Sequence, residues 1–316
     1  MPEKLKKKIF VYIKIIIAVA IIYFLVKNIR LQNLMSALSS VNYYYLLIVA
    51  LLGVLNIYLQ YFKWKEICNK NLGENSFSKI IRSLFSGFAA GLITPARAGE
   101  YWGRYSELSP GEPVKVTYSV LIDKLSLLAV EMTLGAIPAL IFAISFLRST
   151  VLVYVVAVLI LLCFSMLAFS FAGGNIQIEM FVKKITGRYR IINSIYEKYT
   201  SIRLGNNKLK AEILFVSFLQ YLCFCLQLIL LICGFGKNVN FAELALAVGF
   251  VFYARNFLSF LTPGEIGTRE GITVFAFSYL KIDSAVAFNT AFIVFVINVV
   301  IPSVIGALLY LKGSDD

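Results

Sequence analysis

Two groups of charged residues lie beside short breaks in otherwise apolar sequence. They are Arg97, Glu100 and Arg104 near the first break and Arg255, Glu265, Arg269 and Glu270 near the second. Arginine presents a planar fork of donors that matches the oxygens of a phosphate group. Both groups therefore predict a substrate-binding site for a phosphate-bearing or anionic headgroup. The alternative is that each arginine only neutralises a neighbouring glutamate and ties the chain locally.

The breaks repeat one pattern, T-P-x-x-x-G, which reads T-P-A-R-A-G at 94–99 and T-P-G-E-I-G at 262–267. Proline cannot continue a helix, and glycine adopts backbone conformations that other residues resist. We assign the hairpin backbone to Pro95, Gly99, Pro263, Gly264, Gly267 and Gly271. Helix N-termini beside these glycines would offer free N–H groups to an anion. Non-helical backbone at membrane depth must be enclosed by protein or line a wet cavity, which makes each break a site candidate.

A third set of ionisable residues falls inside a long apolar segment and consists of Asp123, Lys124 and Glu131. An intramembrane carboxylate is costly to bury and is a functional candidate by default. We regard these three residues as candidates for energy coupling, with Glu131 carrying a proton. A neutral or paired Glu131 that orders the helix bundle explains the sequence equally well. The amides of the spans are expected to make interhelical hydrogen bonds; they are Asn56, Gln60, Gln220, Gln227, Asn289 and Asn298.

Composition places the chain among membrane proteins. Its 316 residues are 59% hydrophobic with a mean hydropathy of +0.81, well above the usage of soluble domains. The net charge of +13 comes from short basic blocks between apolar stretches, which is the positive-inside pattern and not a nucleic-acid surface. The chain has no histidine, and its five cysteines lack metal-ligand spacing. We therefore expect no metal, no cofactor, no catalytic residues and no enzymatic activity.

The apolar segments divide the chain into two halves of similar plan. In residues 1–148 we predict spans at 9–26 and 43–62, a hairpin at 77–112 and a span at 113–146. In residues 149–316 we predict a span at 151–171, a cytoplasmic basic loop at 173–210, and then a span at 211–234, a hairpin at 241–280 and a span at 284–311. Lys63, Lys65 and Lys70 follow the second span and are assigned to a cytoplasmic block.

The number of membrane crossings decides whether each broken segment crosses the bilayer or enters and leaves on the same side. If 77–93 crossed the bilayer alone, the basic loop at 173–210 would lie outside, against the charge rule. A hairpin that enters and leaves on one side restores the rule, and the same count makes the second hairpin enter from the opposite side. The prediction is an all-α polytopic membrane protein with about six transmembrane helices and two oppositely oriented re-entrant hairpins in an inverted repeat. Eight true crossings with short return helices, such as one at 272–280, would give the same loop sides.

The two motifs resemble the flippase-like transmembrane family that includes the membrane domain of lysylphosphatidylglycerol synthase, the multiple peptide resistance factor. The second motif, at 262–271, is close to the family's P-G-x-x-G-x-R-E-G and is the more specific of the two. Glu265 departs from that pattern, because the family often has glycine there. The resemblance implies a protein that handles lipids, with relatives linked to aminoacylated phospholipids or polyprenyl-linked sugars. The chain ends at Asp316 without a soluble aminoacyl-transferase domain, so we do not expect it to lysylate lipids.

The expected function is therefore that of a lipid flippase in the bacterial cytoplasmic membrane, with both termini in the cytoplasm. Arg97 and Arg269 would hold the lipid phosphate, while Glu100 and Glu270 would position them or bind a cationic headgroup. The alternative is a lipid-binding partner of a membrane glycosyltransferase or synthase that transports nothing itself. Small residues on several spans suit close helix contacts within one chain or between two, which leaves a homodimer open.

Overall fold

The computed structural model describes residues 35–36, 38–94, 97–108, 113–147 and 207–312. The described part is helical, and its elements are α3 (Tyr43–Asn71), α4 (Phe77–Leu92), α5 (Gly99–Glu107), α6 (Pro113–Phe142), η1 (Ala143–Leu147), α10 (Asn207–Gly234), α11 (Phe241–Leu258), α12 (Thr268–Ser278), α13 (Ser284–Phe295), η2 (Val296–Val300) and α14 (Ile301–Lys312). The predicted spans at 9–26 and 151–171, most of the basic loop at 173–210, and Pro95 lie outside the described residues.

Within the described residues, five helices are long and apolar enough to cross a membrane. They are Tyr43–Asn71, Pro113–Leu147, Lys208–Gly234, Phe241–Leu258 and Ser284–Leu309. Four of them correspond to predicted spans, and Phe241–Leu258 is the first arm of the predicted second hairpin. The prediction of an all-α polytopic membrane protein is confirmed at this level.

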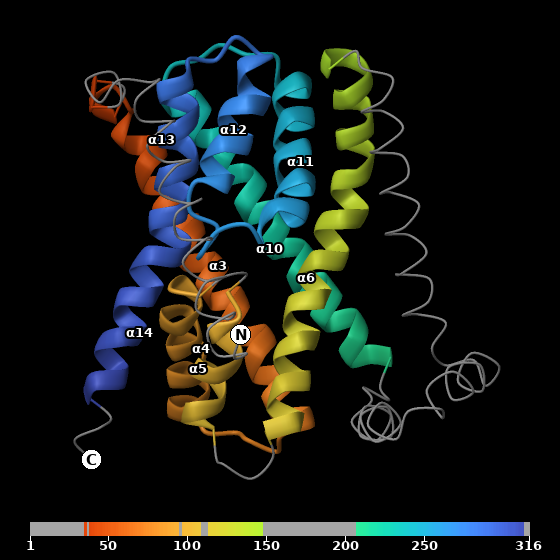
Figure 1. The fold of residues 1–316 in the computed structure, drawn as a ribbon, viewed down its shortest axis with the longest axis vertical. Coiled ribbons are helices and arrows are strands. Elements are labelled where there is room, and N and C mark those ends of the chain that lie inside the picture. The colour runs from red at the N-terminus through yellow and green to blue at the C-terminus, as the bar shows by residue number, and fades with distance from the viewer. Residues whose placement is uncertain (1–34, 37, 95–96, 109–112, 148–206, 313–316) are drawn as a thin grey trace, which may run out of the picture.

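The two broken segments occupy opposite ends of the molecule (Figure 1). The helices α4 and α5 lie side by side in the lower half, whereas α11 and α12 lie in the upper half, and both connecting turns lie near the middle. The longer helices α6 and α10 and the α13–α14 pair extend past both turns. With 16 residues, α4 is about 24 Å long, which is shorter than the about 30 Å of a bilayer's hydrocarbon core.

The helices α4 and α5 pack backbone to backbone because glycines face the contact. A Cβ atom at Gly99 would overlap the backbone oxygen of Ala90, and one at Gly103 would overlap that of Ser86. Glycines four residues apart let two helices approach closely in a membrane protein. This spacing holds α5 close to α4 and so determines how far the side chains of α5 lie from α4.

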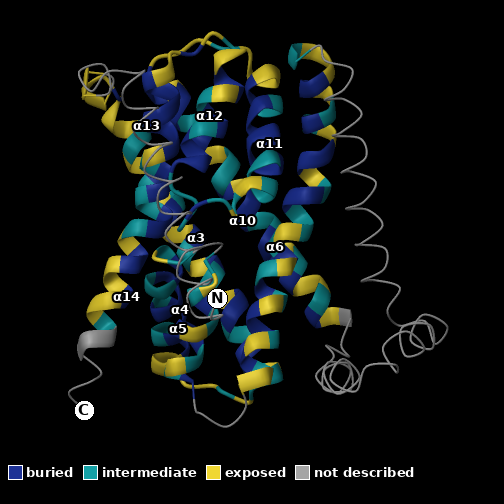
Figure 2. Cartoon of the chain, in the orientation of Figure 1, coloured by how far each residue is buried: buried dark blue, intermediate teal, exposed yellow. Residues whose placement is uncertain are grey.

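The outer surface of the bundle is apolar. On α3, exposed apolar side chains recur at helical spacing on one stripe, formed by Leu47, Leu51, Val54 and Tyr58, and Figure 2 shows the alternation of exposed and buried residues along the outer helices. An apolar stripe of this kind suits contact with lipid chains rather than water. The buried apolar residues form two main clusters. One includes residues of α6, α10, α11, α12 and α13, and the other includes residues of α3, α4, α6 and α10.

Amide side chains link three helices in the interior. The Asn56 amide donates to Asn298 Oδ1 at 2.8 Å, and the Asn298 amide donates to Gln227 Oε1 at 2.9 Å. Gln227 in turn donates to the backbone oxygen of Val49 at 3.1 Å. Asn298 lies in the π-helical turn η2, a local widening of the helix that is frequent at functional sites. The expected interhelical hydrogen bonds are confirmed for these three amides.

Candidate functional site

The first break is closed by its own threonine. Thr94 Oγ1 accepts a hydrogen bond from the Gly99 N–H at 2.7 Å, so the threonine at the start of T-P-x-x-x-G caps the helix that begins at its glycine. Between them, Arg97 has a φ of 53°, a left-handed conformation that costs a non-glycine residue about 1–3 kcal/mol. The spacing of the motif therefore forms a strained turn with a capped helix after it.

The second break adopts a related turn with a different cap. Gly264 and Gly267 have φ values of 58° and 85°, which confirms the unusual backbone predicted for these glycines. Glu265 occupies the motif position of Arg97 and is also left-handed, with a φ of 63°. A glycine would fit this position without strain, so Glu265 holds a conformation that is unfavourable for its residue type. The Gly267 N–H donates to Glu270 Oε2 at 2.7 Å.

These caps correct one prediction. The N–H groups of Gly99 and Gly267 are not free for an anion, because Thr94 and Glu270 already accept from them. Glu270 caps helix α12, and within the described residues the carboxylate that forms an ion pair with Arg269 is Glu265, 2.9 Å away. The sequence contained the capping signal, since a glutamate three residues after the N-cap is half of a capping box.

The two breaks touch each other. The Gly264 N–H donates to the backbone oxygen of Thr94 at 3.3 Å, and a Cβ atom at Gly264 would lie 2.7 Å from the backbone oxygen of Leu92. The residue at the tip of the second break must therefore be small. Motifs far apart in the sequence meet backbone to backbone, as the pairing of the two patterns predicted.

Glu100 joins three cations beside the first break. Its carboxylate lies 2.6 Å from Arg97 Nε, 2.6 Å from Lys124 Nζ and 3.5 Å from an Arg104 Nη atom. The Glu100 side chain is 1% exposed, whereas those of Arg97 and Lys124 are 18% and 33% exposed. The anionic partner is thus enclosed, while two of its cations reach the surface of the cluster.

Asp123 shares Arg104 with Glu100 and adds one further cation, Lys63. Its carboxylate lies 2.8 Å from an Arg104 Nη atom and 2.9 Å from Lys63 Nζ. The Arg104 guanidinium also lies over the ring of Trp64, 4.4 Å from the ring centre, a favourable cation–π arrangement. We call the six linked side chains from α3, α5, α6 and the break the first charge network: Lys63, Arg97, Glu100, Arg104, Asp123 and Lys124.

Lys63 was assigned wrongly from the sequence. The helix α3 continues to Asn71, and Lys63 is buried with 2% of its surface exposed. Besides Asp123, it donates to Gln220 Oε1 at 2.8 Å and to Ser217 Oγ at 3.2 Å. A buried ammonium is tolerated when it is paired and hydrogen-bonded in this way. The available signal was that Lys63 continues the stripe of Asn56 and Gln60 at helical spacing.

Glycines on α4 make room for the network. A Cβ atom at Gly91 would lie 2.6 Å from Glu100 Cγ, and one at Gly87 would lie 2.8 Å from Arg104 Cγ. Any side chain at these positions would displace the buried ion pair of α5. The close packing of α4 against α5 and the placement of the charges on α5 thus both depend on the face of α4 that carries Gly87 and Gly91.

The second charge network consists of Glu131, Arg255, Glu265 and Arg269. Arg255 lies 2.9 Å from Glu131 and 3.9 Å from Glu265, which itself lies 2.9 Å from Arg269. Each arginine also lies over a phenylalanine ring, Arg255 at 4.8 Å and Arg269 at 4.7 Å from the ring centre. Charges of alternating sign therefore run in a chain from α6 through α11 to α12.

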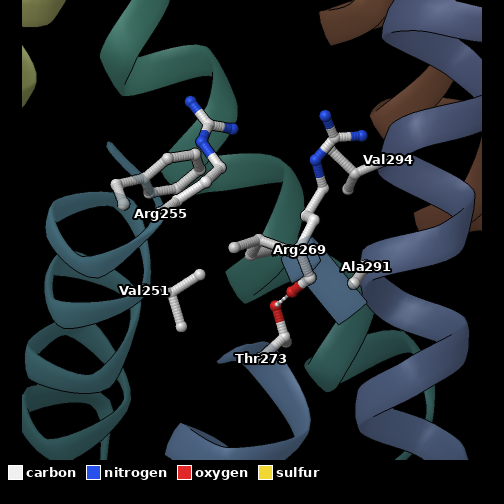
Figure 3. A pocket seen from close by; sticks show the side chains of 8 residues that line it. Val251, Arg255, Arg269, Thr273, Ala291 and Val294 are labelled. Atoms are coloured by element: carbon white, nitrogen blue, oxygen red, sulfur yellow. Dashed lines mark hydrogen bonds between the residues drawn. The ribbon is translucent and has the colours of Figure 1, made fainter. Parts of the chain in front are cut away.

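A small cavity adjoins this second network. It has a volume of about 10 Å³ and is lined by Leu228, Val251, Phe252, Arg255, Arg269, Thr273, Ala291 and Val294. This is the space of about one water molecule. Figure 3 shows the two arginines on opposite sides of the cavity with their guanidinium groups pointing the same way, and the Thr273 hydroxyl donating to the backbone oxygen of Arg269.

The long helix α6 connects the two networks. Asp123 and Lys124 belong to the first and Glu131 to the second, so all three predicted coupling residues are in ion pairs. Within the described residues no ion pair joins one network to the other, and the link between them is α6 and the contact of the two breaks. The described residues also contain no cluster of three or more metal-ligating side chains.

The fold and these networks define a helical multi-pass membrane protein in which two charge-bearing helix breaks meet. A family model of the lysylphosphatidylglycerol synthase TM region matches residues 11–306, and the chain belongs to this family. The resemblance inferred from the two motifs is confirmed, and membership associates the chain with lipid handling in the membrane. No curated protein matches the chain.

Proposed function

We propose that this protein is a lipid flippase that moves a phospholipid or a polyprenyl-phosphate-linked lipid across the membrane. The observation that carries the proposal is the contact between the two breaks, where the Gly264 N–H donates to the Thr94 oxygen and a charge network lies on each side. The polar headgroup would pass this contact while the acyl chains stay in lipid. Arg97 and Arg269 flank it and would hold the phosphate in turn.

The membrane arrangement that we propose is an inverted repeat with two re-entrant hairpins. It is supported by the placement of α4–α5 and α11–α12 at opposite ends of the molecule (Figure 1). The reading with eight true crossings needs α12 to cross, but its 11 residues reach only about 16 Å. The charge rule supports a cytoplasmic side for the basic loop at 173–210 and for both termini. We propose the bacterial cytoplasmic membrane as the location.

The energy coupling that we propose uses the ion pairs of α6. Glu131 shares Arg255 with Glu265, so protonating Glu131 would leave Arg255 to Glu265 alone and loosen α6 from α11. Asp123 and Lys124 are the corresponding candidates on the first network. A two-state element whose partners can be exchanged in this way is what an alternating-access cycle requires.

Reconstituted liposomes test the transport function directly. Labelled phospholipids and polyprenyl phosphates should become accessible across the bilayer faster with the protein than without it. The variants Arg97→Gln and Arg269→Gln should lower the rate by about tenfold to a hundredfold, because each removes a charge-assisted contact worth about 1.5–3 kcal/mol. Lys237→Gln, a charge change in the exposed turn before α11, is the matched control and should leave the rate unchanged. Equal rates with and without protein across the whole lipid panel would overturn the proposal.

A second function, in which a headgroup bound at the first network is not moved, is favoured by the small cavity at the second network, which has room for only about one water molecule. The protein would then bind a lipid headgroup and present it to a membrane glycosyltransferase or synthase without moving it. This alternative predicts headgroup binding with no flip and a stable complex with the enzyme. In either function the chain has no catalytic role of its own, and a homodimer formed through small residues is compatible with both.

A further inference from the structure

The first charge network carries more positive than negative charge. Its four cations are Lys63, Arg97, Arg104 and Lys124, and its two carboxylates are Glu100 and Asp123. Each carboxylate is shared, and within the described residues no third carboxylate forms an ion pair with these cations. A buried cluster with an excess of two positive charges is costly unless an anion joins it.

The most exposed charges of the network are cations. Lys124 and Arg97 are the most exposed members, at 33% and 18%, while the two carboxylates are 1% and 10% exposed. Both cations contact Glu100, at the break where a headgroup is proposed to pass. The Nε atom of the buried Arg104 also makes no hydrogen bond among the described residues. The network therefore presents donors outward and keeps its acceptors inside.

The second charge network differs in both respects. Its two arginines face two glutamates, so its charge is balanced, and a further carboxylate, Glu270, lies next to Arg269 in the sequence as a helix cap. An anion entering there would have to break an existing ion pair. The two halves of the proposed lipid site therefore differ in net charge, although their backbone turns are alike.

We propose that the first charge network is the phosphate-binding half of the site and that it selects a doubly charged phosphate group over a phosphodiester. A phosphate monoester or a diphosphate on a lipid supplies the two negative charges that the network lacks, whereas a phosphodiester supplies one. The inference rests on the proposed function and names its substrate class. Lys124 and Arg97 are the residues that contact the phosphate. Lys63 and Arg104 are buried and add to the positive electrostatic potential at the site.

The test compares two lipids with the same acyl chains. Phosphatidic acid carries a phosphate monoester and phosphatidylglycerol a phosphodiester, and their binding to the full chain in nanodiscs is measured by competition. The second unit of charge should make phosphatidic acid bind about tenfold more tightly or better. Its affinity should also rise between about pH 5.5 and pH 7, as the monoester loses its second proton near pH 6. Over this range phosphatidylglycerol should show no such rise.

Substitutions at Lys124 sharpen the test. Lys124→Gln removes one cation but leaves Glu100 paired with Arg97 and Arg104, so the variant should fold and the preference for phosphatidic acid should fall to about threefold or less. Lys124→Arg keeps the charge and should restore the preference and the pH dependence. The control Lys237→Gln should match the unaltered protein in both measurements.

Three outcomes would overturn the inference. They are equal affinities for the two lipids, a preference that Lys124→Gln leaves intact, and displacement of phosphatidic acid by an equal concentration of inorganic phosphate, which would assign the site to the free ion. Failure of the proposed function is a separate result, because it appears as absent flip in liposomes even when the preference for phosphatidic acid holds. The two measurements therefore distinguish a wrong substrate class from a wrong activity.

Discussion

The two broken segments share a backbone design and differ in their charges. Arg97 and Glu265 occupy the same motif position with the same left-handed backbone, yet one is a cation and the other an anion. Around the first break the cations outnumber the carboxylates, whereas around the second they are balanced. A repeated turn thus sets where charges lie, while the surrounding helices decide what they can bind.

The sharpest test of this difference removes one carboxylate from each network. Asp123→Asn leaves Lys63 and Arg104 buried without their nearest anion and should lower the free energy of unfolding by about 3–5 kcal/mol. Glu131→Gln leaves Arg255 its second partner, Glu265, at 3.9 Å and should cost about 1–3 kcal/mol. Thermal and denaturant unfolding in detergent measure both.

A double variant checks the cause of the larger loss. Lys63→Met combined with Asp123→Asn removes one of the two stranded cations and should recover part of the stability lost by Asp123→Asn alone. Equal losses for Asp123→Asn and Glu131→Gln would show that the networks do not differ in how their cations are compensated.

Glycine substitutions compare the packing of the two hairpins. Gly99→Ala places a Cβ atom against the Ala90 backbone oxygen and should cost about 1–3 kcal/mol, as overpacking does. Gly271→Ala in α12 meets nothing within 4 Å and should stabilise the helix by about 0.5–1 kcal/mol. Unfolding midpoints that move in the same direction would contradict the packing described for α4 and α5.

The motif threonines provide an isosteric comparison. Thr94→Val leaves the Gly99 N–H without its acceptor at 2.7 Å and should cost about 1–2 kcal/mol. Thr262→Val removes a hydroxyl contact to Thr268 of 3.3 Å and should cost about 0.5 kcal/mol or less. Thr94→Ser keeps the acceptor and should restore most of the loss. Stability that is insensitive to Thr94→Val would exclude the cap as the reason for the T-P-x-x-x-G spacing.

The smallest effect is expected where the first arm of each hairpin begins. Asn240 caps α11 by accepting from the Ala242 N–H at 2.9 Å, so Asn240→Ala should cost about 1 kcal/mol. Ser76 begins α4 without a side-chain cap, and Ser76→Ala should change stability by less than about 0.5 kcal/mol. Hydrogen exchange in the first turn of each arm measures the difference, and similar protection changes would contradict it.

The sequence was most informative about properties that one segment carries alone. The long apolar runs predicted four of the five helices found to be long enough to span, and the proline and glycine pairs predicted where the chain turns. The capping signal of Glu270 was also visible in the sequence, but the residue was interpreted as one that positions Arg269 or binds a cationic headgroup. These features follow from local backbone conformation and hydropathy, which neighbouring residues largely determine.

Ion-pair partners, by contrast, depend on residues that the fold brings together from different helices. Lys63 is charged like its neighbours Lys65 and Lys70, and the sequence alone placed it in the cytoplasm, yet Asp123 pairs with it inside the bundle. Likewise Glu131 meets Arg255 and Lys124 meets Glu100 because α6 passes both hairpins. Apolar length and glycine position are local, so the sequence determined the family, the helices and the breaks. Charge compensation acts through space, so only the tertiary structure decided which carboxylate holds each cation and where cations outnumber carboxylates.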